Sequence, residues 1–327
     1  MNKTNNILVT GGAGYIGSHI VEQLVKTNTN IIILDNLVTG FKRLINKKAK
    51  FIKGNILNSK IIKKIEKWKP QIIYHLAAQS AGESAYDDPK DDYLTNGYGT
   101  YLIAKLAKKI KCKYFIYASS VAVYGSNPQK KITEKSPINP DSIYGISKFV
   151  GEMFVKQLLQ NSKTKVRIIR IFNTFGPGQN ILNLRKGMVG IYSYYFWAKK
   201  PIIVKGSIKR FRNHVFIDDC IKILFKCLNN KKLKKFETIN LTSAKKTTVK
   251  ELVSSILKIN NLKNYPIKIK KGTKGDSFGF HSSNNLLKKK FYGFKFTPLN
   301  TGISIFFNWI NKLNTKNIKN SHPLKLK

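Results

Sequence analysis

Residues 5–17 of the chain read Asn-Asn-Ile-Leu-Val-Thr-Gly-Gly-Ala-Gly-Tyr-Ile-Gly. The apolar run at 5–10 predicts a buried strand, and apolar side chains recur with helical spacing over residues 16–25. Between them, Gly11, Gly14 and Gly17 leave a turn with few Cβ atoms, so that the backbone can approach a pyrophosphate at the positive end of the helix. The stretch therefore predicts an α/β fold that binds a dinucleotide.

An acidic residue after the second predicted strand strengthens this interpretation. Residues 31–34 are apolar, and Asp35 follows them 18 residues after Gly17. A carboxylate about 20 residues beyond such a turn accepts hydrogen bonds from an adenosine ribose and repels a ribose phosphate. A glycine-rich turn alone also occurs in ordinary tight turns. The strand, the helix and Asp35 together favour a dinucleotide site that prefers NAD to NADP.

Predicted strands and helices alternate along the first half of the chain. Strands are expected at 51–52, 71–76, 113–118 and 166–171, with helices at 59–67, 96–109 and 142–159. This alternation predicts a doubly wound parallel Rossmann sheet with right-handed crossovers. We expect an NAD-binding domain over residues 1–175, a smaller, interleaved C-terminal substrate-binding lobe over 176–317 and a frayed tail over 318–327. A strand at 237–241 and a helix at 248–257 are expected to return to the sheet.

The composition is strongly basic, with 60 Lys and Arg against 16 Asp and Glu and a net charge of +44. One interpretation is binding to nucleic acid or to an anionic surface. The lysines are scattered in short clusters along the whole chain, which favours a solvated basic surface without a specific nucleic-acid partner.

Neither a metal site nor a membrane span is expected from the sequence. Cys112, Cys220 and Cys227 lack metal-ligand spacing and are interpreted as buried thiols in a reducing cytoplasm. No leader and no apolar run near 18 residues is recognised, so we expect a cytoplasmic protein.

A phenol and an ammonium group are expected on one face of the helix predicted at 142–159. Tyr144 and Lys148 are four residues apart, so their side chains project in the same direction. A nearby ammonium group and a positive nicotinamide ring both favour phenolate, so we expect the pKa of Tyr144 to be lowered. Ser120 ends a predicted strand at the sheet edge where ligands bind, and it can hydrogen-bond the same substrate hydroxyl. The alternatives are an exposed Tyr/Lys pair and a serine that caps a turn.

These segments resemble the extended short-chain dehydrogenase/reductase family, and within it the nucleotide-sugar 4-epimerases. The resemblance runs almost from end to end, in the family's order and spacing. It rests on residues 10–17, 35–37, 75–79, 95–96, 99–100, 119–125, 144–148, 172–173, 176–178 and 212–219.

The resemblance implies a role for each matching residue. Ser120, Tyr144 and Lys148 would form the catalytic triad. Contacts with NAD are implied at Gly11, Gly14, Tyr15, Ile16, Gly17, Asp35, Asn36, Asn55, Ile56, Leu76, Ala77, Ala78, Asn96, Ser119, Tyr144 and Lys148. Contacts with a UDP-sugar are implied at Ser120, Tyr144, Asn173, Arg212 and Asp276, with Arg212 on the diphosphate. A homodimer through the helices at 96–109 and 142–159 is also implied.

The implied reaction inverts carbon 4 of a UDP-hexose through a transient 4-keto sugar, with tightly bound NAD. The related 4,6-dehydratases carry an Asp-Glu pair after the catalytic hydroxyl residue, whereas this chain has Val121-Ala122, which argues against dehydration. A dehydrogenase or reductase with net cofactor turnover remains the alternative, although Asp35 disfavours NADPH.

Two positions bear on cofactor and sugar binding. Asn55 stands where the family usually has an aspartate for adenine, and its amide oxygen can still accept a hydrogen bond. Phe280 would occupy the gate beside the hexose, which would favour glucose and galactose over their N-acetylated forms.

Overall fold

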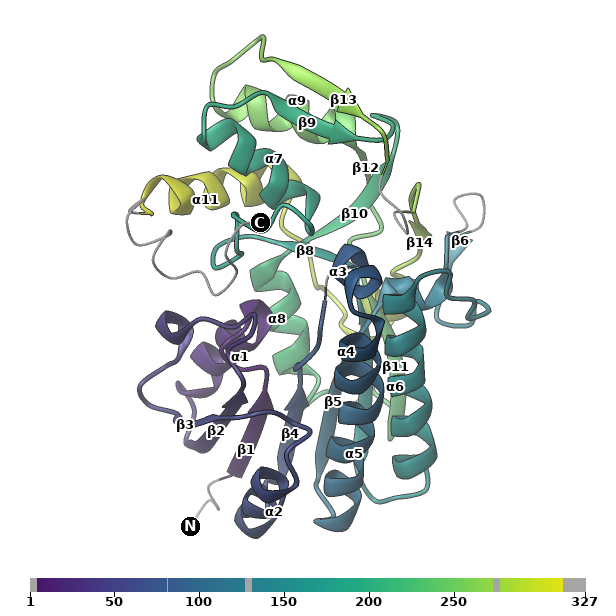
Figure 1. Ribbon diagram of the computed structural model, residues 1–327. Coiled ribbons are helices and arrows are strands. Elements are labelled where there is room, and N and C mark those ends of the chain that lie inside the picture. The colour runs from purple at the N-terminus through teal and green to yellow at the C-terminus, as the bar shows by residue number, and fades with distance from the viewer. Residues whose placement is uncertain (1–4, 81, 127–130, 273–276, 314–327) are drawn as a thin grey trace.

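The computed structural model describes residues 5–80, 82–126, 131–272 and 277–313. Its centre is a seven-stranded sheet whose neighbours all pair in parallel, in the order β11-β7-β5-β4-β1-β2-β3 (Figure 1). Its strands are β1 (Asn5–Thr10), β2 (Thr29–Asp35), β3 (Lys50–Lys53), β4 (Ile72–His75), β5 (Tyr114–Ser120), β7 (Lys165–Ile171) and β11 (Phe236–Leu241). The strand order reverses between β1 and β4, and ligands bind outside the carboxyl ends of the strands at such a reversal.

Helices cover both faces of the sheet because alternate strand side chains point to opposite faces. One face packs on α1 (Tyr15–Leu24) and α8 (Ile217–Lys226), and the other on α2 (Ser59–Trp68), α5 (Gly99–Lys109) and α6 (Ile143–Leu159). In β1, for example, Ile7 and Val9 belong to the first apolar cluster and Leu8 to the second. The predicted doubly wound α/β fold is confirmed.

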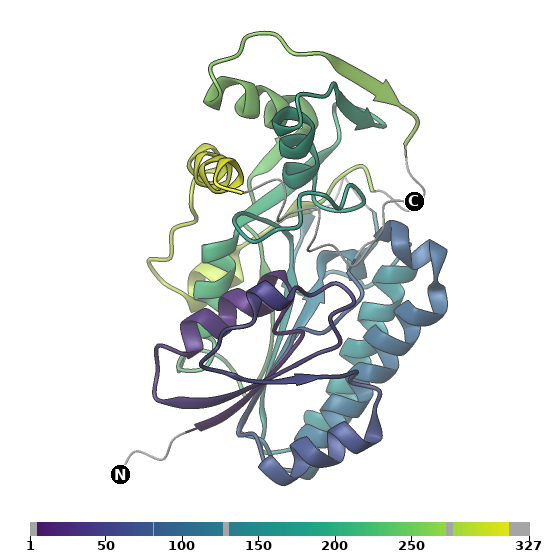
Figure 2. The ribbon, with the colours of Figure 1, turned by 60° about the vertical axis from the view of Figure 1, so that its left-hand side comes forward.

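A smaller lobe lies beyond the carboxyl ends of the sheet strands (Figures 1 and 2). It contains α7 (Met188–Trp197), α9 (Val249–Ile259) and α11 (Leu299–Asn311). A three-stranded sheet, β12-β10-β8, connects it to the main domain. The strands outside the main sheet are β8 (Asn173–Phe175), β9 (Ile202–Lys205), β10 (Phe211–Phe216), β12 (Lys246–Thr248) and β13 (Ile267–Lys270), with the short pair β6 (Lys131–Ile132) and β14 (His281–Ser282).

The remaining elements are short. They are α3 (Gly82–Asp87), α4 (Pro89–Asp92), α10 (Asn285–Lys290), a π-helix (Tyr93–Tyr98) and 3-10 turns at Lys42–Leu44 and Val121–Tyr124.

Two sequence expectations need correction. Strand β11 pairs with β7 in the main sheet as expected, but α9 packs on α7, α11 and β12 in the smaller lobe. The apolar stripe of α9 predicts burial without saying which core receives it. The helix expected at 96–109 begins as the π-helix before continuing as α5. The predicted tail and Asp276 lie outside the described residues.

Candidate active site

The glycine-rich turn after β1 is shaped by close backbone contacts. Gly11 has a φ of +71°, and a Cβ there would lie 2.6 Å from the backbone nitrogen of Ala77. A Cβ on Gly17 would lie 2.0 Å from the carbonyl oxygen of Gly11. Helix α1 begins directly after Gly14, and no side chain caps its first turn. Backbone N–H groups are therefore left at a positive helix end, and the turn fits the pyrophosphate of a dinucleotide.

Asp35 ends β2 at the same edge of the sheet. Its carboxylate accepts hydrogen bonds from the backbone nitrogens of Ala13 (3.0 Å) and Leu37 (2.8 Å), which fix it beside the glycine-rich turn. Burial raises the pKa of Asp35, and these two hydrogen bonds act in the opposite direction. Each carboxylate oxygen has a further lone pair, so Asp35 can still accept from a ribose hydroxyl.

Two other residues predicted to contact NAD already accept hydrogen bonds from nearby backbone. The side-chain oxygens of Asn36 and Asn55 accept from the backbone nitrogens of Val38 (3.1 Å) and Leu57 (2.9 Å). The amide oxygen of Asn55, expected to replace a carboxylate at the adenine, is thus already engaged in a local turn. Ile56, next to it, is buried.

A hydrogen-bonded chain through His75 fixes the segment after β4, which holds Leu76, Ala77 and Ala78. The Thr100 hydroxyl donates to the Asn96 carbonyl (2.6 Å) and therefore accepts from His75 Nε2 (3.0 Å). His75 Nδ1 then accepts from the Thr10 hydroxyl (2.8 Å), which accepts from the Ala77 backbone nitrogen (3.3 Å). Burial, followed by the charge of Lys148, lowers the pKa of His75 to about 3, so the ring stays neutral.

Asn96 lies inside the π-helix and is completely buried. Its Nδ2 donates to the carbonyl of Gln79 (2.9 Å) and to Ser147 Oγ (3.0 Å). Its Oδ1 has no hydrogen-bond partner in the structure. This residue therefore ties the segment after β4 to α6 and keeps one acceptor for a ligand. π-helical turns are frequent at functional sites.

The predicted catalytic residues come from β5 and α6. Ser119 and Ser120 are the last two residues of β5. Ser142 caps α6 by accepting from the Gly145 nitrogen (3.1 Å), and Tyr144 and Lys148 follow on the first turns. Ser120 Oγ accepts from the Ala122 nitrogen (3.2 Å), and its hydroxyl also hydrogen-bonds with Tyr144. The structure thus brings the three predicted side chains to the carboxyl edge of the sheet.

The protonation of Tyr144 differs from the sequence expectation. Burial raises its pKa to about 12, a hydrogen bond with Ser120 lowers it, and the charge of Asp92 raises it. Burial lowers the pKa of Lys148 to about 7, against the charges of Asp92 and Glu152. The expected lowering of the Tyr144 pKa is therefore wrong for the chain by itself, because removing the phenolate from water costs more than its neighbours return.

Ser119 belongs to a buried ionic network below the catalytic residues. It donates to Glu152 Oε1 (2.5 Å). The Arg170 guanidinium grips both oxygens of Glu152, at 2.9 and 2.7 Å, and donates to the Tyr124 hydroxyl at 2.7 Å. Glu152 and Arg170 are both almost fully buried. Ser119 is thus hydrogen-bonded to Glu152, whereas Ser120 is hydrogen-bonded with Tyr144.

The predicted substrate residues Asn173 and Arg212 lie on the small sheet β12-β10-β8. Arg212 donates to the backbone carbonyls of Phe211, Phe278 and Ser277 at 2.8, 3.2 and 2.8 Å. Burial, and then the charge of Arg210, lowers the pKa of Arg212 to about 10, so it remains cationic at neutral pH.

His214 completes this group and was not singled out from the sequence. It shares a strand face with Arg212, two residues away, and its Cα is paired with that of Asn173 across β10 and β8. Both Asn173 Oδ1 and His214 Nε2 are buried, and neither has a hydrogen-bond partner among the described residues. The alternation Arg212-x-His214 was the available signal, but the pairing with Asn173 appears only in the folded chain.

The loops beside the sheet edge are held by α1. The Tyr15 hydroxyl donates to the carbonyl of Gly176 (3.3 Å), and His19 Nε2 contacts that of Pro177 (2.9 Å). Ile16 packs against the larger apolar cluster, which also buries Phe280. The gate role of Phe280 stays a prediction.

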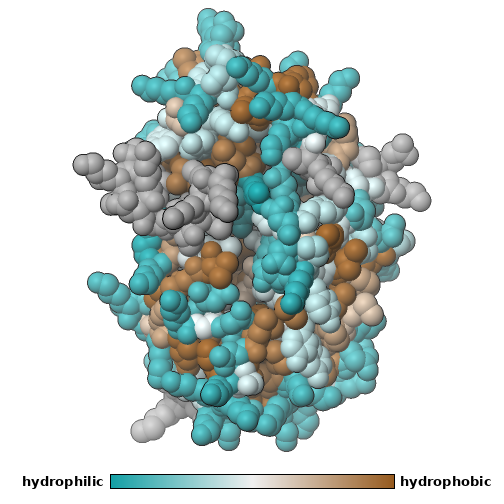
Figure 3. Space-filling model, in the orientation of Figure 1, coloured by the Kyte–Doolittle hydropathy of each residue, from teal (hydrophilic) through white to brown (hydrophobic). Residues whose placement is uncertain are grey.

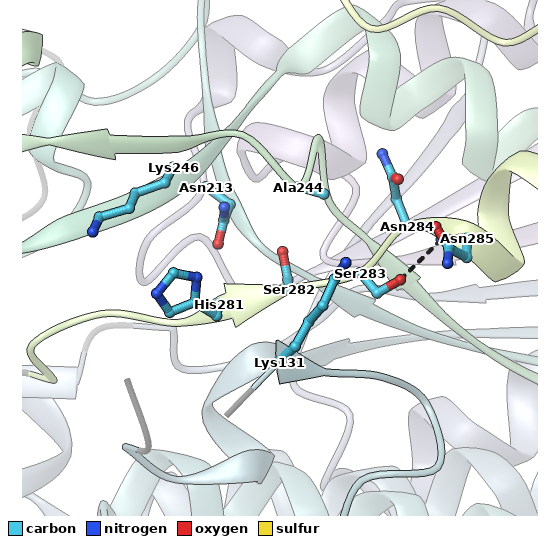
Figure 4. Close-up of a pocket in the computed structure, with 9 residues that line it drawn as sticks. All are labelled: Lys131, Asn213, Ala244, Lys246, His281, Ser282, Ser283, Asn284 and Asn285. Carbon is cyan, nitrogen blue, oxygen red and sulfur yellow. Dashed lines mark hydrogen bonds between the residues drawn. The ribbon is translucent and has the colours of Figure 1, made fainter. Parts of the chain in front are cut away.

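A separate cavity of about 340 Å³ lies near β14 (Figure 4). It is lined by Lys131, Asn213, Ala244, Lys246, His281, Ser282, Ser283, Asn284 and Asn285. None of the predicted site residues that the structure describes lines it. Asn213 and Arg212 are neighbours on β10 and therefore point to opposite faces of that strand.

Metal-ligand clusters and membrane-spanning helices are both absent from residues 5–80, 82–126, 131–272 and 277–313. In that part of the chain, no three His, Cys, Asp or Glu side chains gather as they would around a metal ion. No helix there is both long and apolar enough to cross a membrane. Cys112, Cys220 and Cys227 are buried free thiols.

Comparison with known proteins agrees with this geometry. The sequence pattern of the NAD dependent epimerase/dehydratase family matches residues 7–242. A putative UDP-glucose 4-epimerase from Methanocaldococcus jannaschii is 36% identical over 254 residues, covering 76% of this chain and 81% of the relative. A dTDP-D-glucose 4,6-dehydratase from Homo sapiens is 30% identical over 262 residues, covering 77% and 73%.

A solved structure shows the same fold with a ligand. The UDP-glucose 4-epimerase of Thermotoga maritima, crystallised with UDP-glucose, superposes with a TM-score of 0.88 at 28% identity. The match covers 94% of this chain and 99% of that structure.

Proposed function

The chain belongs to the NAD-dependent epimerase/dehydratase family, and we propose that it is a nucleotide-sugar 4-epimerase that inverts carbon 4 of a UDP-hexose. The observation that carries this proposal is that Ser120, Tyr144 and the glycine-rich turn all follow the carboxyl ends of strands in one parallel sheet. A proton-transferring pair and a dinucleotide cradle together suit oxidation and re-reduction of an alcohol.

The residues that would hold NAD are those around the turn. Gly11, Gly14 and Gly17 would admit the pyrophosphate, and Asp35 would accept from the adenosine ribose. Lys148 would donate to the nicotinamide ribose. When bound, NAD supplies the chemistry of taking a hydride from carbon 4 and giving it back.

The proton steps belong to Tyr144 and Ser120. Tyr144 takes the proton of the sugar 4-hydroxyl as carbon 4 is oxidised, and returns it when the opposite face is reduced. Ser120, which hydrogen-bonds with Tyr144 in this structure, would donate to the same sugar oxygen and stabilise its developing charge. The net change is inversion at carbon 4, with no atom gained or lost.

Inversion requires the sugar to turn while its nucleotide stays held. Arg212, whose guanidinium donates to three backbone carbonyls in this structure, would supply positive charge to the diphosphate. Asn173 and His214 offer an unpaired acceptor and an unpaired ring nitrogen on the neighbouring strand positions. These anchors lie on the small sheet, apart from the catalytic residues on β5 and α6, so the sugar can swing while the anchors hold the nucleotide.

The structure also bears on the competing reactions. Ser120 is followed by Val121-Ala122 in a 3-10 turn, and neither side chain can move a proton for dehydration. The alternative, a dehydrogenase or reductase with net NAD(P)(H) turnover, would consume added cofactor in proportion to sugar.

Proton NMR of UDP-galactose incubated with purified protein and no added NAD tests the proposal. Formation of UDP-glucose is expected, and UDP-N-acetylhexosamines and UDP-uronates are compared in parallel. Tyr144→Phe should lower turnover by about 10²- to 10⁴-fold while NAD is retained, because only the base is removed. An equally active Phe variant would refute the mechanism.

We also propose a cytoplasmic homodimer. The free buried cysteines suit a reducing compartment. Ile146 and Met153, seven residues apart on α6, are 50% and 55% exposed, and Tyr98 is 42% exposed. Apolar patches interrupt the hydrophilic surface where α5 and α6 lie (Figure 3). Light scattering checks this, and a monomer mass would contradict it.

A further inference from the structure

A buried carboxylate without a role in the mechanism above lies against the helix turn that carries Lys148. Asp92, the last residue of α4, is completely buried. Its Oδ2 accepts from Ser147 Oγ at 2.5 Å, and its Oδ1 accepts from Asn96 Nδ2 at 3.3 Å. Ser147 immediately precedes Lys148, so these hydrogen bonds fasten Asp92, the π-helix and the catalytic turn of α6 together.

The groups that face Lys148 come from four elements. Its Nζ lies 4.4 Å from the centre of the Tyr117 ring, and His75, which burial keeps neutral, lies within its electrostatic influence. Asp92 and Glu152 are the carboxylates whose charges raise the pKa of Lys148, and Tyr144 lies one turn before it on α6.

The two carboxylates are not equivalent. Glu152 is bound through both oxygens by Arg170, so most of its charge is already compensated. Among the described residues, Asp92 makes no salt bridge within 4 Å, and Lys148 is the cation that lowers its pKa. The negative charge left to support a buried ammonium group is therefore that of Asp92.

We propose that Asp92 is a positioning residue that keeps Lys148 protonated and, through Ser147, aligned with Tyr144. This role rests on the proposed function, since an ammonium group at Lys148 supports the base and the cofactor ribose. A buried amine loses its proton readily, and a fixed carboxylate opposes that loss. Asp92 also raises the pKa of Tyr144 directly, so its removal would disfavour the ammonium form of Lys148 and favour the phenolate form of Tyr144.

The first test needs no activity. In protein labelled with ¹³C at the lysine Cε, NMR follows the lysines that titrate near neutrality. Burial lowers the pKa of Lys148 to about 7 and that of Lys186 to about 8, and a Lys148→Arg spectrum assigns the signal. Asp92→Asn should lower the Lys148 midpoint by about one pH unit. Ser147→Ala removes the hydrogen bond, keeps the charge and should leave the midpoint nearly unchanged.

The second test is the pH profile of kcat on the converted UDP-sugar. The kcat of the Asp92→Asn variant should be about tenfold lower at pH 8.5, because a Lys148 midpoint lowered by about one pH unit leaves about a tenth as much of the ammonium form at that pH. Its deficit should shrink towards pH 6, where Lys148 regains its proton. Asp92→Glu, which restores the charge, should recover most of the loss at high pH.

The outcomes are separable. An unchanged lysine midpoint in Asp92→Asn, or a kcat deficit equal at every pH, overturns the role of Asp92. If the unsubstituted protein converts no UDP-sugar, the proposed function fails, and the NMR titration still decides whether Asp92 controls the Lys148 proton. If Asp92→Asn does not fold, Asp92→Ser serves as the variant without the charge: a Lys148 midpoint that is unchanged in Asp92→Ser, or lowered as much by Ser147→Ala as by Asp92→Ser, would overturn the proposal.

Discussion

Replacing Gly17 by alanine tests whether the turn after β1 is a cradle that depends on its missing Cβ atoms. The added Cβ would lie 2.0 Å from the Gly11 carbonyl oxygen and 2.8 Å from the Gly12 Cα, whereas ordinary contacts begin at 3.4 Å. The carbonyl would have to move by about 1 Å or more. Gly11 has little room to move, because its backbone nitrogen donates a hydrogen bond to the Leu34 carbonyl and the Ala77 backbone fills the space where a Cβ would lie.

Because Gly11 cannot move far, helix α1, which carries residue 17, must shift instead. Overpacking of this kind costs about 1–3 kcal/mol of unfolding free energy, and helix N–H groups that move by about 1 Å no longer meet a pyrophosphate together. We expect the Tm without cofactor to fall by several degrees and the Kd for NAD to rise at least tenfold. Calorimetry in the absence of NAD and a fluorescence titration with NAD measure the two effects.

Gly14→Ala is the matched control for folding. Its added Cβ would lie 3.1 Å from the same carbonyl oxygen, a crowding that a small shift relieves, so its Tm should change little. A Gly17→Ala protein with the Tm and the NAD affinity of the unsubstituted chain would refute the reasoning about the turn.

Two further changes probe the buried polar groups. Glu152→Gln should lower the free energy of unfolding in urea by about 3–5 kcal/mol, because Arg170 loses its charge partner. Combining it with Arg170→Met should recover much of that loss. A loss below about 1 kcal/mol in Glu152→Gln would contradict this reasoning. Burial lowers the pKa of His214 to about 3, so the unfolded chain binds an extra proton as pH falls below about 6.5 and stability is lost there. Between pH 7 and pH 5 the His214→Gln protein should lose about 2 kcal/mol less than the unsubstituted protein, and equal losses would show that His214 is not held neutral.

Much of the fold could be predicted because its signals are local. The signals are the apolar run of β1, the glycine spacing and Asp35, which all lie within the first 35 residues. The conformation of each depends mainly on residues nearby in the sequence. The same holds for Tyr144 and Lys148, whose spacing on α6 is fixed by helix geometry once Ser142 caps it. The argument against dehydration likewise depends only on the position of Val121-Ala122 directly after Ser120.

What escaped prediction depends on contacts between distant segments. His214 faces Asn173 because β10 pairs with β8, 41 positions apart, and neither strand shows this partner in its own sequence. Asp92 reads as one of several acids near a helix start, and its burial beside Ser147 arises only when α4 packs against α6. Helix α9 has a clear capping box and apolar stripe, yet these do not say which lobe receives it.

The protonation of the site was the least accessible property, and the reason is burial. For the chain by itself the pKa of Tyr144 is raised to about 12 and that of Lys148 is lowered to about 7, so burial disfavours both phenolate and ammonium. The phenolate of Tyr144 and the ammonium group of Lys148 are each stabilised mainly by the opposite charge of the other or of a further ion. Asp92 supports the ammonium side of this pair, and a cationic nicotinamide ring would support the phenolate side. Under the proposed function, the phenolate of Tyr144 would therefore be most populated when NAD is held beside it, which would couple proton removal to the presence of the group that receives the hydride.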